Sequence, residues 1–304
     1  MRITLWGVRG SIATPGAATA AFGGNTTCIE VSDGDRRLVL DAGTGLRALG
    51  QSLAARAPLP PIYLLLTHTH WDHIQGLPFF APIYDARNEI HIYGPRFPGR
   101  PLRDIVLGQF DYPWFPVNGV EIAARLHVHE LQEEVFTIGP FTVACQLMNH
   151  PVLTLGYRVQ CGDRSVVYTG DHEPCFDLAN LHTPGLPPGG ETLRLTRSQV
   201  DALVERANRR TADFARGVDV LVTDAQYTPE EYETKRGWGH SSTRHALDLA
   251  VETGARRLVL FHHDPARSDA QLEAMEREAQ AAAKARGAAC EVIAAREGAP
   301  IDVS

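Results

Sequence analysis

The sequence contains few cysteines and no paired cysteine motif. Five cysteines are scattered along the 304 residues, and no two of them form a C-x-x-C pair. An odd, scattered set argues against a disulfide framework and favours reduced thiols, as in a cytoplasmic protein. We assign no catalytic role to any of them; they are Cys28, Cys145, Cys161, Cys175 and Cys290.

Long hydrophobic runs and an excess of positive charge are also lacking. No apolar segment approaches the roughly 20 residues needed to span a bilayer, and the opening M-R-I-T-L-W leads into a strand pattern rather than a signal peptide. The net charge of −7 gives no general attraction to nucleic acid or to acidic membrane surfaces. We therefore expect a cytoplasmic protein without a membrane partner, and a nucleic-acid partner is not favoured.

Strand and helix patterns alternate in both halves of the chain. Strands are predicted at 2–7, 27–32, 37–41, 62–67, 90–93, 121–129, 134–138, 141–147, 156–160, 165–169, 218–223, 257–261 and 290–294, and helices at 46–56, 198–216, 242–253 and 268–286. The length allows one large α/β domain or two smaller ones; we expect a single domain over residues 1–304. This pattern fits two sheets packed face to face with helices outside. The Pro- and Gly-rich stretch 183–190 is predicted to be a surface loop.

The most informative motif is T-H-T-H-W-D-H at residues 67–73, which directly follows the apolar run 62–66. On a tight loop, His68 and His70 can point to one metal ion while Asp72 and His73 point to a second. Imidazole and carboxylate are ligands that suit zinc, and also iron or manganese. The alternative is a solvated polar loop that happens to be rich in histidine. The H-x-H-x-D-H spacing at the end of a strand favours the metal site.

Three further polar residues follow apolar strands later in the chain. His150 follows the predicted strand 141–147, Asp171 follows 165–169 and His262 follows 257–261. This edge of an α/β sheet is where functional groups collect. Alone, each residue would be interpreted as a solvated strand end. Four such ends in one chain favour a shared metal centre.

Two ligand sets can be assembled from these residues. We expect one metal ion on His68, His70 and His150, a second on Asp72, His73 and His262, and Asp171 bridging the two through its two oxygens. His262 and His263 are adjacent and point to opposite sides of an extended strand, so either could close the second set. We favour His262 because it is the first polar residue after the apolar run.

From W-G-V-R-G-S at 6–11 to H-H-D-P at 262–265, the chain resembles the metallo-β-lactamase-fold hydrolases, which implies a four-layer αββα sandwich. Three features resemble the phosphodiesterase branch, which includes ribonuclease Z and cyclic ribose phosphodiesterases. They are His73 directly after Asp72, H-x-x-x-x-x-G-Y-R at 150–158, and D-A-Q-Y-T at 224–228 followed by G-H-S-S at 239–242. The 22 residues from His240 to His262 also match the spacing of that branch.

The resemblance implies roles for residues that are not metal ligands. His240 would face the scissile phosphate, and Asp224 would orient its ring. With Asp72, these two form the predicted catalytic set. Asp41 would support the histidine loop from behind, since metal-bound histidines need a partner for the other ring nitrogen. The alternative for His240 is a structural place beside a helix start capped by Ser241 or Ser242, and both interpretations can hold together.

The expected reaction is hydrolysis of a phosphodiester through a metal-bridging hydroxide at a dinuclear centre. Only 20 residues separate His150 from Asp171, which leaves no room there for a long RNA-gripping arm, so a small or cyclic phosphodiester is expected. The alternatives are a metal-dependent hydrolase of a carbonyl ester (thioester, lactone or β-lactam) and a non-catalytic module that binds metal or ligand. A homodimer is expected from the resemblance alone.

The remaining histidines and aromatic residues carry weaker signals. The histidines outside the ligand sets lack ligand spacing and are interpreted as structural or surface residues; they are His91, His127, His129, His172, His182 and His245. His172 is the strongest competitor among them because it directly follows Asp171. The aromatic cluster Phe110, Tyr112, Trp114 and Phe115 could roof the pocket or form a dimer contact, but packing in the core is favoured.

Overall fold

Two seven-stranded sheets form the centre of the molecule in a computed structural model that describes residues 1–56, 59–177 and 196–303. The first sheet has the order β14-β1-β2-β3-β4-β5-β6. Its strands are β1 (Arg2–Gly7), β2 (Cys28–Asp33), β3 (Arg36–Leu40), β4 (Ile62–Leu65), β5 (Glu89–Pro95), β6 (Arg125–Leu131) and β14 (Pro300–Asp302).

The second sheet has the order β13-β12-β11-β10-β9-β8-β7. Its strands are β7 (Glu134–Ile138), β8 (Phe141–Met148), β9 (Thr154–Cys161), β10 (Arg164–Tyr168), β11 (Val220–Asp224), β12 (Arg257–Phe261) and β13 (Glu291–Ala294). In each sheet four neighbouring strands run parallel, β3 to β6 in the first and β10 to β13 in the second. The carboxyl ends of these parallel strands carry most of the residues predicted to be functional.

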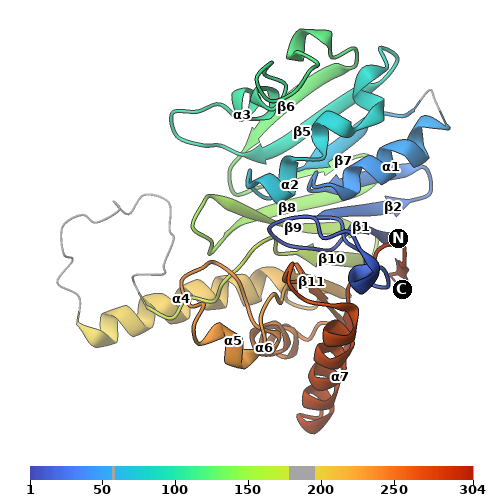
Figure 1. Ribbon diagram of the computed structural model, residues 1–304. Coiled ribbons are helices and arrows are strands. Elements are labelled where there is room, and N and C mark those ends of the chain that lie inside the picture. The colour runs from blue at the N-terminus through green and yellow to red at the C-terminus, as the bar shows by residue number, and fades with distance from the viewer. Residues whose placement is uncertain (57–58, 178–195, 304) are drawn as a thin grey trace.

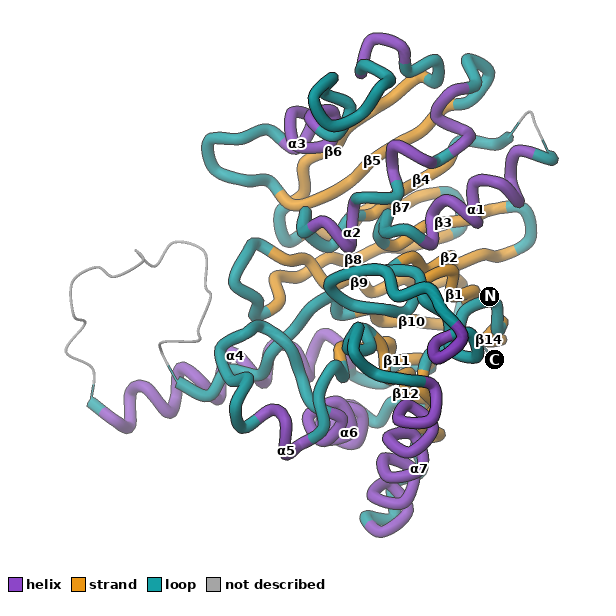
Figure 2. Tube along the Cα trace, viewed as in Figure 1, coloured by secondary structure: helices purple, strands orange, loops and turns teal. Residues whose placement is uncertain are grey.

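The helices lie on the outer faces of the sheets, α1 to α3 over the first and α4 to α7 over the second (Figures 1 and 2). They are α1 (Gly45–Ala54), α2 (Trp71–Ile74), α3 (Leu102–Gly108), α4 (Arg197–Ala215), α5 (Pro229–Tyr232), α6 (Thr243–Thr253) and α7 (Asp269–Ala285). Short 3-10 turns lie at Ala17–Thr19, Leu77–Phe79, Ala81–Tyr84 and Gly119–Glu121. None of the helices in the described ranges has the length and apolar character to cross a membrane.

Three separate apolar clusters define the layers. The central cluster contains residues of both sheets, such as Ile3 and Val31 from the first and Val143 and Val166 from the second. A second cluster joins α1 to the outer face of the first sheet, and a third joins α6 and α7 to the outer face of the second. The order of layers is therefore helix, sheet, sheet, helix, which confirms the predicted αββα sandwich.

Two differences from the predicted elements have identifiable causes. The strand predicted at 121–129 begins only at Arg125, because Asn118 and Glu121 form a capping box around a 3-10 turn. Strand β14 was not predicted, since it is only three residues long and begins with proline; it forms through antiparallel pairing with β1. Residues 183–190 and His182 lie outside the described residues, and the single-domain assignment stays a prediction.

Candidate metal centre

The histidine-rich loop connects β4 to the short helix α2 and brings its side chains to one point. Leu66 continues the apolar run after β4, and His68 and His73 are fully buried. Asp72 is also buried, whereas His70 remains exposed. The loop therefore presents three of its four candidate ligands in the interior, where unpaired polar groups are costly.

The structure brings the seven predicted ligand residues into two groups that share Asp171. The ligand atoms within each group all lie within 4.8 Å of one another. One group is His68, His70, His150 and Asp171, and the other is Asp72, His73, Asp171 and His262. This grouping is the one expected from the sequence, and the His/Asp cluster suits divalent metal ions.

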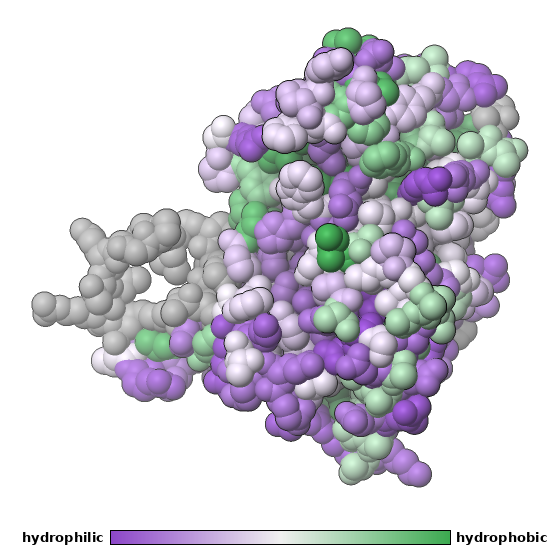
Figure 3. Space-filling model, in the orientation of Figure 1, coloured by the Kyte–Doolittle hydropathy of each residue, from purple (hydrophilic) through white to green (hydrophobic). Residues whose placement is uncertain are grey.

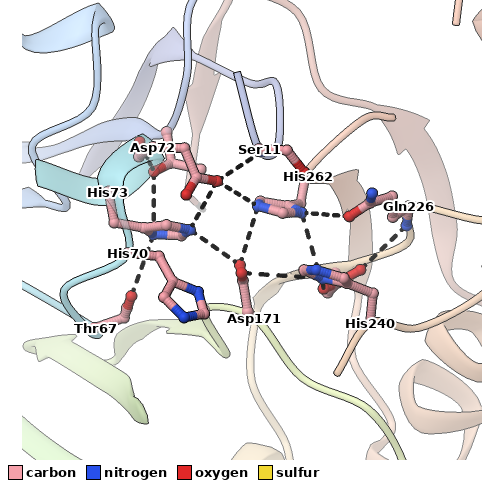
Figure 4. Close-up of polar contacts among 12 residues, drawn as sticks. Ser11, Thr67, His70, Asp72, His73, Asp171, Gln226, His240 and His262 are labelled. Carbon is pink, nitrogen blue, oxygen red and sulfur yellow. Dashed lines mark hydrogen bonds and ion pairs between the residues drawn. The ribbon is translucent and has the colours of Figure 1, made fainter. Parts of the chain in front are cut away.

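Several ligand atoms at the centre have no hydrogen-bond partner within the described ranges. They are Nε2 of His68, Nε2 of His73 and Oδ1 of Asp171, all buried. Figure 4 shows Asp171 between the rings of His73 and His262, with 3.2 Å from its Oδ1 to Nε2 of each. Ligands about 2.0–2.2 Å from one ion lie about 3.3–3.5 Å apart in a tetrahedral shell. The unpartnered atoms and their separations therefore fit metal binding.

The other ring nitrogen of each buried histidine is held by a fixed partner. His73 Nδ1 lies 2.8 Å from Asp41 Oδ2, and His262 Nδ1 lies 3.0 Å from the Gln226 side-chain oxygen. His150 Nδ1 lies 2.9 Å from the Gly239 carbonyl oxygen. These acceptors favour the Nδ1–H form, which leaves the Nε2 lone pair for a metal ion. Asp41 thus occupies the supporting place that the resemblance implied.

The two adjacent histidines after β12 point in different directions. His262 Nε2 lies 3.2 Å from Asp72 Oδ2, whereas His263 Nε2 lies 2.9 Å from the Ala295 carbonyl oxygen. Gly10 packs directly on the His262 ring, since a Cβ at that position would come within 2.3 Å of the imidazole. The geometry thus places the His262 ring, and not the His263 ring, beside the other candidate ligands; its role as a ligand stays a prediction.

Backbone strain is concentrated at this centre. The non-glycine residues with positive φ in the described chain are Ser11 at 61°, Asp41 at 63° and His262 at 62°. The Ser11 amide donates to Asp72 Oδ2 at 2.7 Å, so all three strained residues touch or belong to the candidate ligand set. Left-handed conformations of such residues persist only where the surroundings enforce them, and they cluster at functional sites.

His240 lies at the rim of the same centre. Its Nδ1 is 2.7 Å from Asp224 Oδ2, and its ring stacks on His262 with centroids 4.9 Å apart. Burial would lower the pKa of His240, but the Asp224 carboxylate outweighs it and raises the pKa to about 9. Ser242 caps the following helix α6, which confirms the structural interpretation of His240; its catalytic role stays a prediction.

The surroundings of the centre shift the pKa values of its candidate ligands. Burial would raise the pKa of Asp171, but His262, His73 and His68 around it hold that pKa well below its usual range. Burial lowers the pKa of His150 to about 4. Neutral imidazoles and ionised carboxylates are the forms that bind metal ions.

Two supporting residues were not identified from the sequence. Gln226 holds His262, as described above, and Glu173 accepts from the amides of Gly237 and Gly239 at 2.8 and 3.0 Å. Glu173 thereby fixes the loop that carries His240. Gln226 lies inside the D-A-Q-Y-T motif and could have been found there, whereas nothing local marks a buried glutamate that binds backbone amides 64 residues away.

The other candidates of the sequence are distributed around the centre. His172 is buried, with its pKa lowered by burial to about 4, and lies outside the candidate ligand groups. Of the predicted aromatic cluster, Phe110 packs in the core, whereas Tyr112 and Trp114 are 78% and 76% exposed.

A pocket of about 580 Å³ lies beside the histidine-rich loop. Hydrophobic residues gather over α2 and α3 on this face (Figure 3). The aromatic side chains that line it are Trp71, Phe79, Trp114 and Phe115, and Arg100 adds a positive charge.

Comparison with known proteins agrees with this geometry. The model of the β-lactamase superfamily domain matches residues 36–183. Ribonuclease Z of Lactococcus lactis is 29% identical over 230 residues, which cover 66% of this chain and 69% of that protein. The crystal structure of the metallo-β-lactamase-fold protein YhfI from Bacillus subtilis has a TM-score of 0.63 at 21% identity and covers 99% of this chain and 98% of its own.

The short form of human tRNase Z also has a TM-score of 0.63, at 20% identity, with both chains fully covered. The two structural similarities show the fold. The similarity to ribonuclease Z supports the phosphodiesterase branch of that fold. The chain therefore has the metallo-β-lactamase fold, and its similarity to ribonuclease Z supports a metal-dependent hydrolase of the phosphodiesterase type.

Proposed function

We propose that the protein hydrolyses a small or cyclic phosphodiester at a dinuclear metal centre. One observation carries this proposal: Asp171 belongs to both ligand groups, and its Oδ1 is buried without a hydrogen-bond partner among the described residues. A carboxylate so placed suits two cations, because it has an oxygen for each and neutralises charge on both. A single-metal site would leave one of the groups without a role.

The residues divide into ligands and residues that act on the substrate. His68, His70 and His150 would hold one ion, and Asp72, His73 and His262 the other, with Asp171 between them. Bound metal ions would supply Lewis acidity toward the phosphoryl oxygens and lower the pKa of water. Zinc suits the nitrogen-rich ligand set best, and manganese and iron are compatible with it.

His240 is the proposed proton donor to the leaving oxygen. Asp224 occupies its Nδ1, so Nε2 is the nitrogen available to a substrate. The rigid capped start of α6 and the Glu173-bound loop hold the ring in place. Asp72 is the third residue of the catalytic set and acts as a metal ligand. The Ser11 amide donates a hydrogen bond to its Oδ2 and so fixes the orientation of the carboxylate.

The chain around the site favours a small substrate. Residues between His150 and Asp171 form only the hairpin of β9 and β10, joined by a tight turn, and carry no inserted arm. The pocket of about 580 Å³ beside the loop is of the size that holds a single small ligand. Its aromatic walls suit a flat group, and Arg100 could bind a phosphate, although Asp111 in the same lining adds the opposite charge.

RNA is the second candidate substrate, because the matched relative at 29% identity is a ribonuclease Z. The net charge of −7 argues against a large polyanion, although a local contact surface could still bind one.

The five free cysteines support a place in the reducing cytoplasm. The homodimer expected from the resemblance stays a prediction.

A substrate panel tests the proposal. Protein reconstituted separately with zinc and manganese is given bis(p-nitrophenyl) phosphate, a nucleoside 2′,3′-cyclic phosphate, an unprocessed tRNA transcript and a p-nitrophenyl carboxylic ester. Metal-dependent turnover of the first two with an intact transcript is the expected result. Cleavage of the transcript at a higher kcat/KM would replace the small substrate by RNA. Turnover of the carboxylic ester alone would overturn phosphodiester chemistry.

A further inference from the structure

A second group of histidines lies at one edge of the first sheet, on the edge strand β6 and its neighbour β5. These strands pair in parallel with His91 opposite His127 and Glu89 opposite Arg125. Because side chains alternate along a strand, all four project from the same face. Ile90 and other residues between them point the opposite way into the core beneath α3. Figure 1 shows β5 and β6 side by side in the upper part of the molecule.

Two imidazole nitrogens of this group lie close to one carboxylate oxygen. Oε1 of Glu89 lies 3.2 Å from Nε2 of His91 and 3.2 Å from Nε2 of His127. All three atoms lie within 4.8 Å of one another. The two separations from Glu89 Oε1 are close to the value expected between two ligands of one tetrahedral ion. That value is about 3.3–3.5 Å for ligands bound at about 2.0–2.2 Å. Two imidazoles and a carboxylate form a three-ligand set that leaves a position for water.

The rings are held in place before any ion arrives. The His91 ring stacks between Tyr63 and His127, with centroids 5.0 and 4.6 Å away. Its Nδ1 lies 3.1 Å from Nε2 of His129, which can accept the Nδ1–H. A ligating histidine usually donates its second ring N–H to such a partner, which fixes the ring and its tautomer. His129 is therefore in the supporting position for a metal bound at His91 Nε2.

The charges are also suitable. Arg125 binds the other oxygen of Glu89, at 3.0 Å from Oε2, and leaves Oε1 to the two histidines. One oxygen of the carboxylate is thus bound to Arg125, and the other faces the two histidines.

We propose that Glu89, His91 and His127 bind one divalent transition-metal ion of the zinc class, separate from the buried centre. Solvent completes its coordination, since the His127 side chain is 44% exposed. The ion joins β6, the edge strand of the sheet, to β5, and so stabilises the edge. The competing arrangement is a metal-free network in which both histidines donate to Glu89 Oε1. The proposal does not depend on the function of the buried centre.

Zinc content and thermal stability of matched variants decide between the two arrangements. Full-length protein, His127→Asn and Arg125→Gln are loaded with zinc, dialysed, and analysed for metal and for Tm with and without added zinc. His127→Asn is expected to hold one equivalent less than the unaltered protein and to lose part of the zinc-dependent rise in Tm. Arg125→Gln keeps all three ligands and removes a competing cation, so its zinc content is expected to be unchanged.

Glu89→Gln provides a second test, because it keeps the shape of the side chain and removes its charge. It is expected to lose the same equivalent as His127→Asn. Equal zinc content and equal thermal response in the unaltered protein, His127→Asn and Glu89→Gln would overturn the site and leave the metal-free network. Loss of the same equivalent in Arg125→Gln would also overturn the assignment, because a variant that keeps all three ligands should keep the ion.

Discussion

The buried centre and the β5–β6 cluster use the same residue types in opposite settings. At the buried centre the ligands stand on loops that follow strands, and three of their atoms are buried without a hydrogen-bond partner within the described residues: Nε2 of His68, Nε2 of His73 and Oδ1 of Asp171. On β5 and β6 the ligands stand on the strands themselves, and Nε2 of His91 and Nε2 of His127 each lie 3.2 Å from Glu89 Oε1 at a partly exposed position. The ligand atoms of the two clusters therefore differ in their access to water.

Burial explains this difference. A buried imidazole without a partner is costly, so a sequence that places several of them together needs a ligand to satisfy them. An exposed imidazole can bind water or a neighbouring carboxylate at little cost. The buried centre therefore needs a metal ion to satisfy its ligands, whereas the β5–β6 cluster does not. We expect the buried centre to bind metal ions more tightly than the β5–β6 cluster.

Asp171→Ala is expected to give the largest effect at the buried centre. Removing the shared carboxylate should lower hydrolysis of bis(p-nitrophenyl) phosphate by about a thousandfold or more, because several kcal/mol of charge stabilisation by the metal ions is lost. Initial rates and metal content are measured on the same preparations, with circular dichroism to verify folding. Glu89→Gln is the matched control and should keep the full rate. An active Asp171→Ala protein would contradict the shared-carboxylate model.

His240→Asn should separate proton donation from simple packing. A nucleoside 2′,3′-cyclic phosphate expels an alkoxide that needs a proton, whereas p-nitrophenolate leaves without one. We therefore expect a loss of about a hundredfold on the cyclic phosphate and only a few-fold loss on bis(p-nitrophenyl) phosphate. Asp224→Asn should show the same selectivity to a smaller degree. Equal losses on both substrates would reduce His240 to a structural residue.

The contrast between the clusters also explains what the sequence could predict. The ligands of the buried centre follow apolar strands, so each is visible locally, and the carboxyl ends of parallel strands meet in any sheet of this kind. His262 could be favoured over its neighbour His263 for the same reason. The layer order followed from strands and helices recurring in both halves.

The β5–β6 cluster was missed because it depends on register. His91 and His127 were interpreted as structural residues, since nothing near either of them in the sequence is a ligand partner except Glu89. Only the pairing of β5 with β6 sets the two rings face to face. Glu173 and the strand β14 escaped for the same physical reason, because their partners lie far away in the chain.

Asp41→Asn tests how far the buried centre relies on its supporting hydrogen bonds. The carboxylate accepts from His73 Nδ1 at 2.8 Å and from the Tyr168 hydroxyl at 2.8 Å. Loss of such a partner typically costs about 10–100-fold in metal affinity, which chelator competition can measure. Tyr168→Phe removes one bond to the same carboxylate and should give a smaller loss. An unchanged affinity in Asp41→Asn would show that burial alone orients His73.

Stepwise removal of metal gives the smallest effect and compares the two clusters in one sample. A brief treatment with a weak chelator should remove one equivalent from the exposed site, because water already reaches His127. The Tm should fall by about 2–4 °C for each kcal/mol of stabilisation that is lost, while phosphodiester hydrolysis persists. Longer treatment with a strong chelator should then abolish hydrolysis as the buried ions leave.

We expect the ion of the β5–β6 cluster to leave before the ions of the buried centre. His127→Asn should lack the first step and keep the second, since its buried ligands are intact. If hydrolysis and the first metal equivalent disappear together in the unaltered protein, the accessible ion belongs to the buried centre, where the exposed His70 offers the nearest opening. In that case the convergence of Glu89, His91 and His127 serves only to pair β6 with β5 through hydrogen bonds.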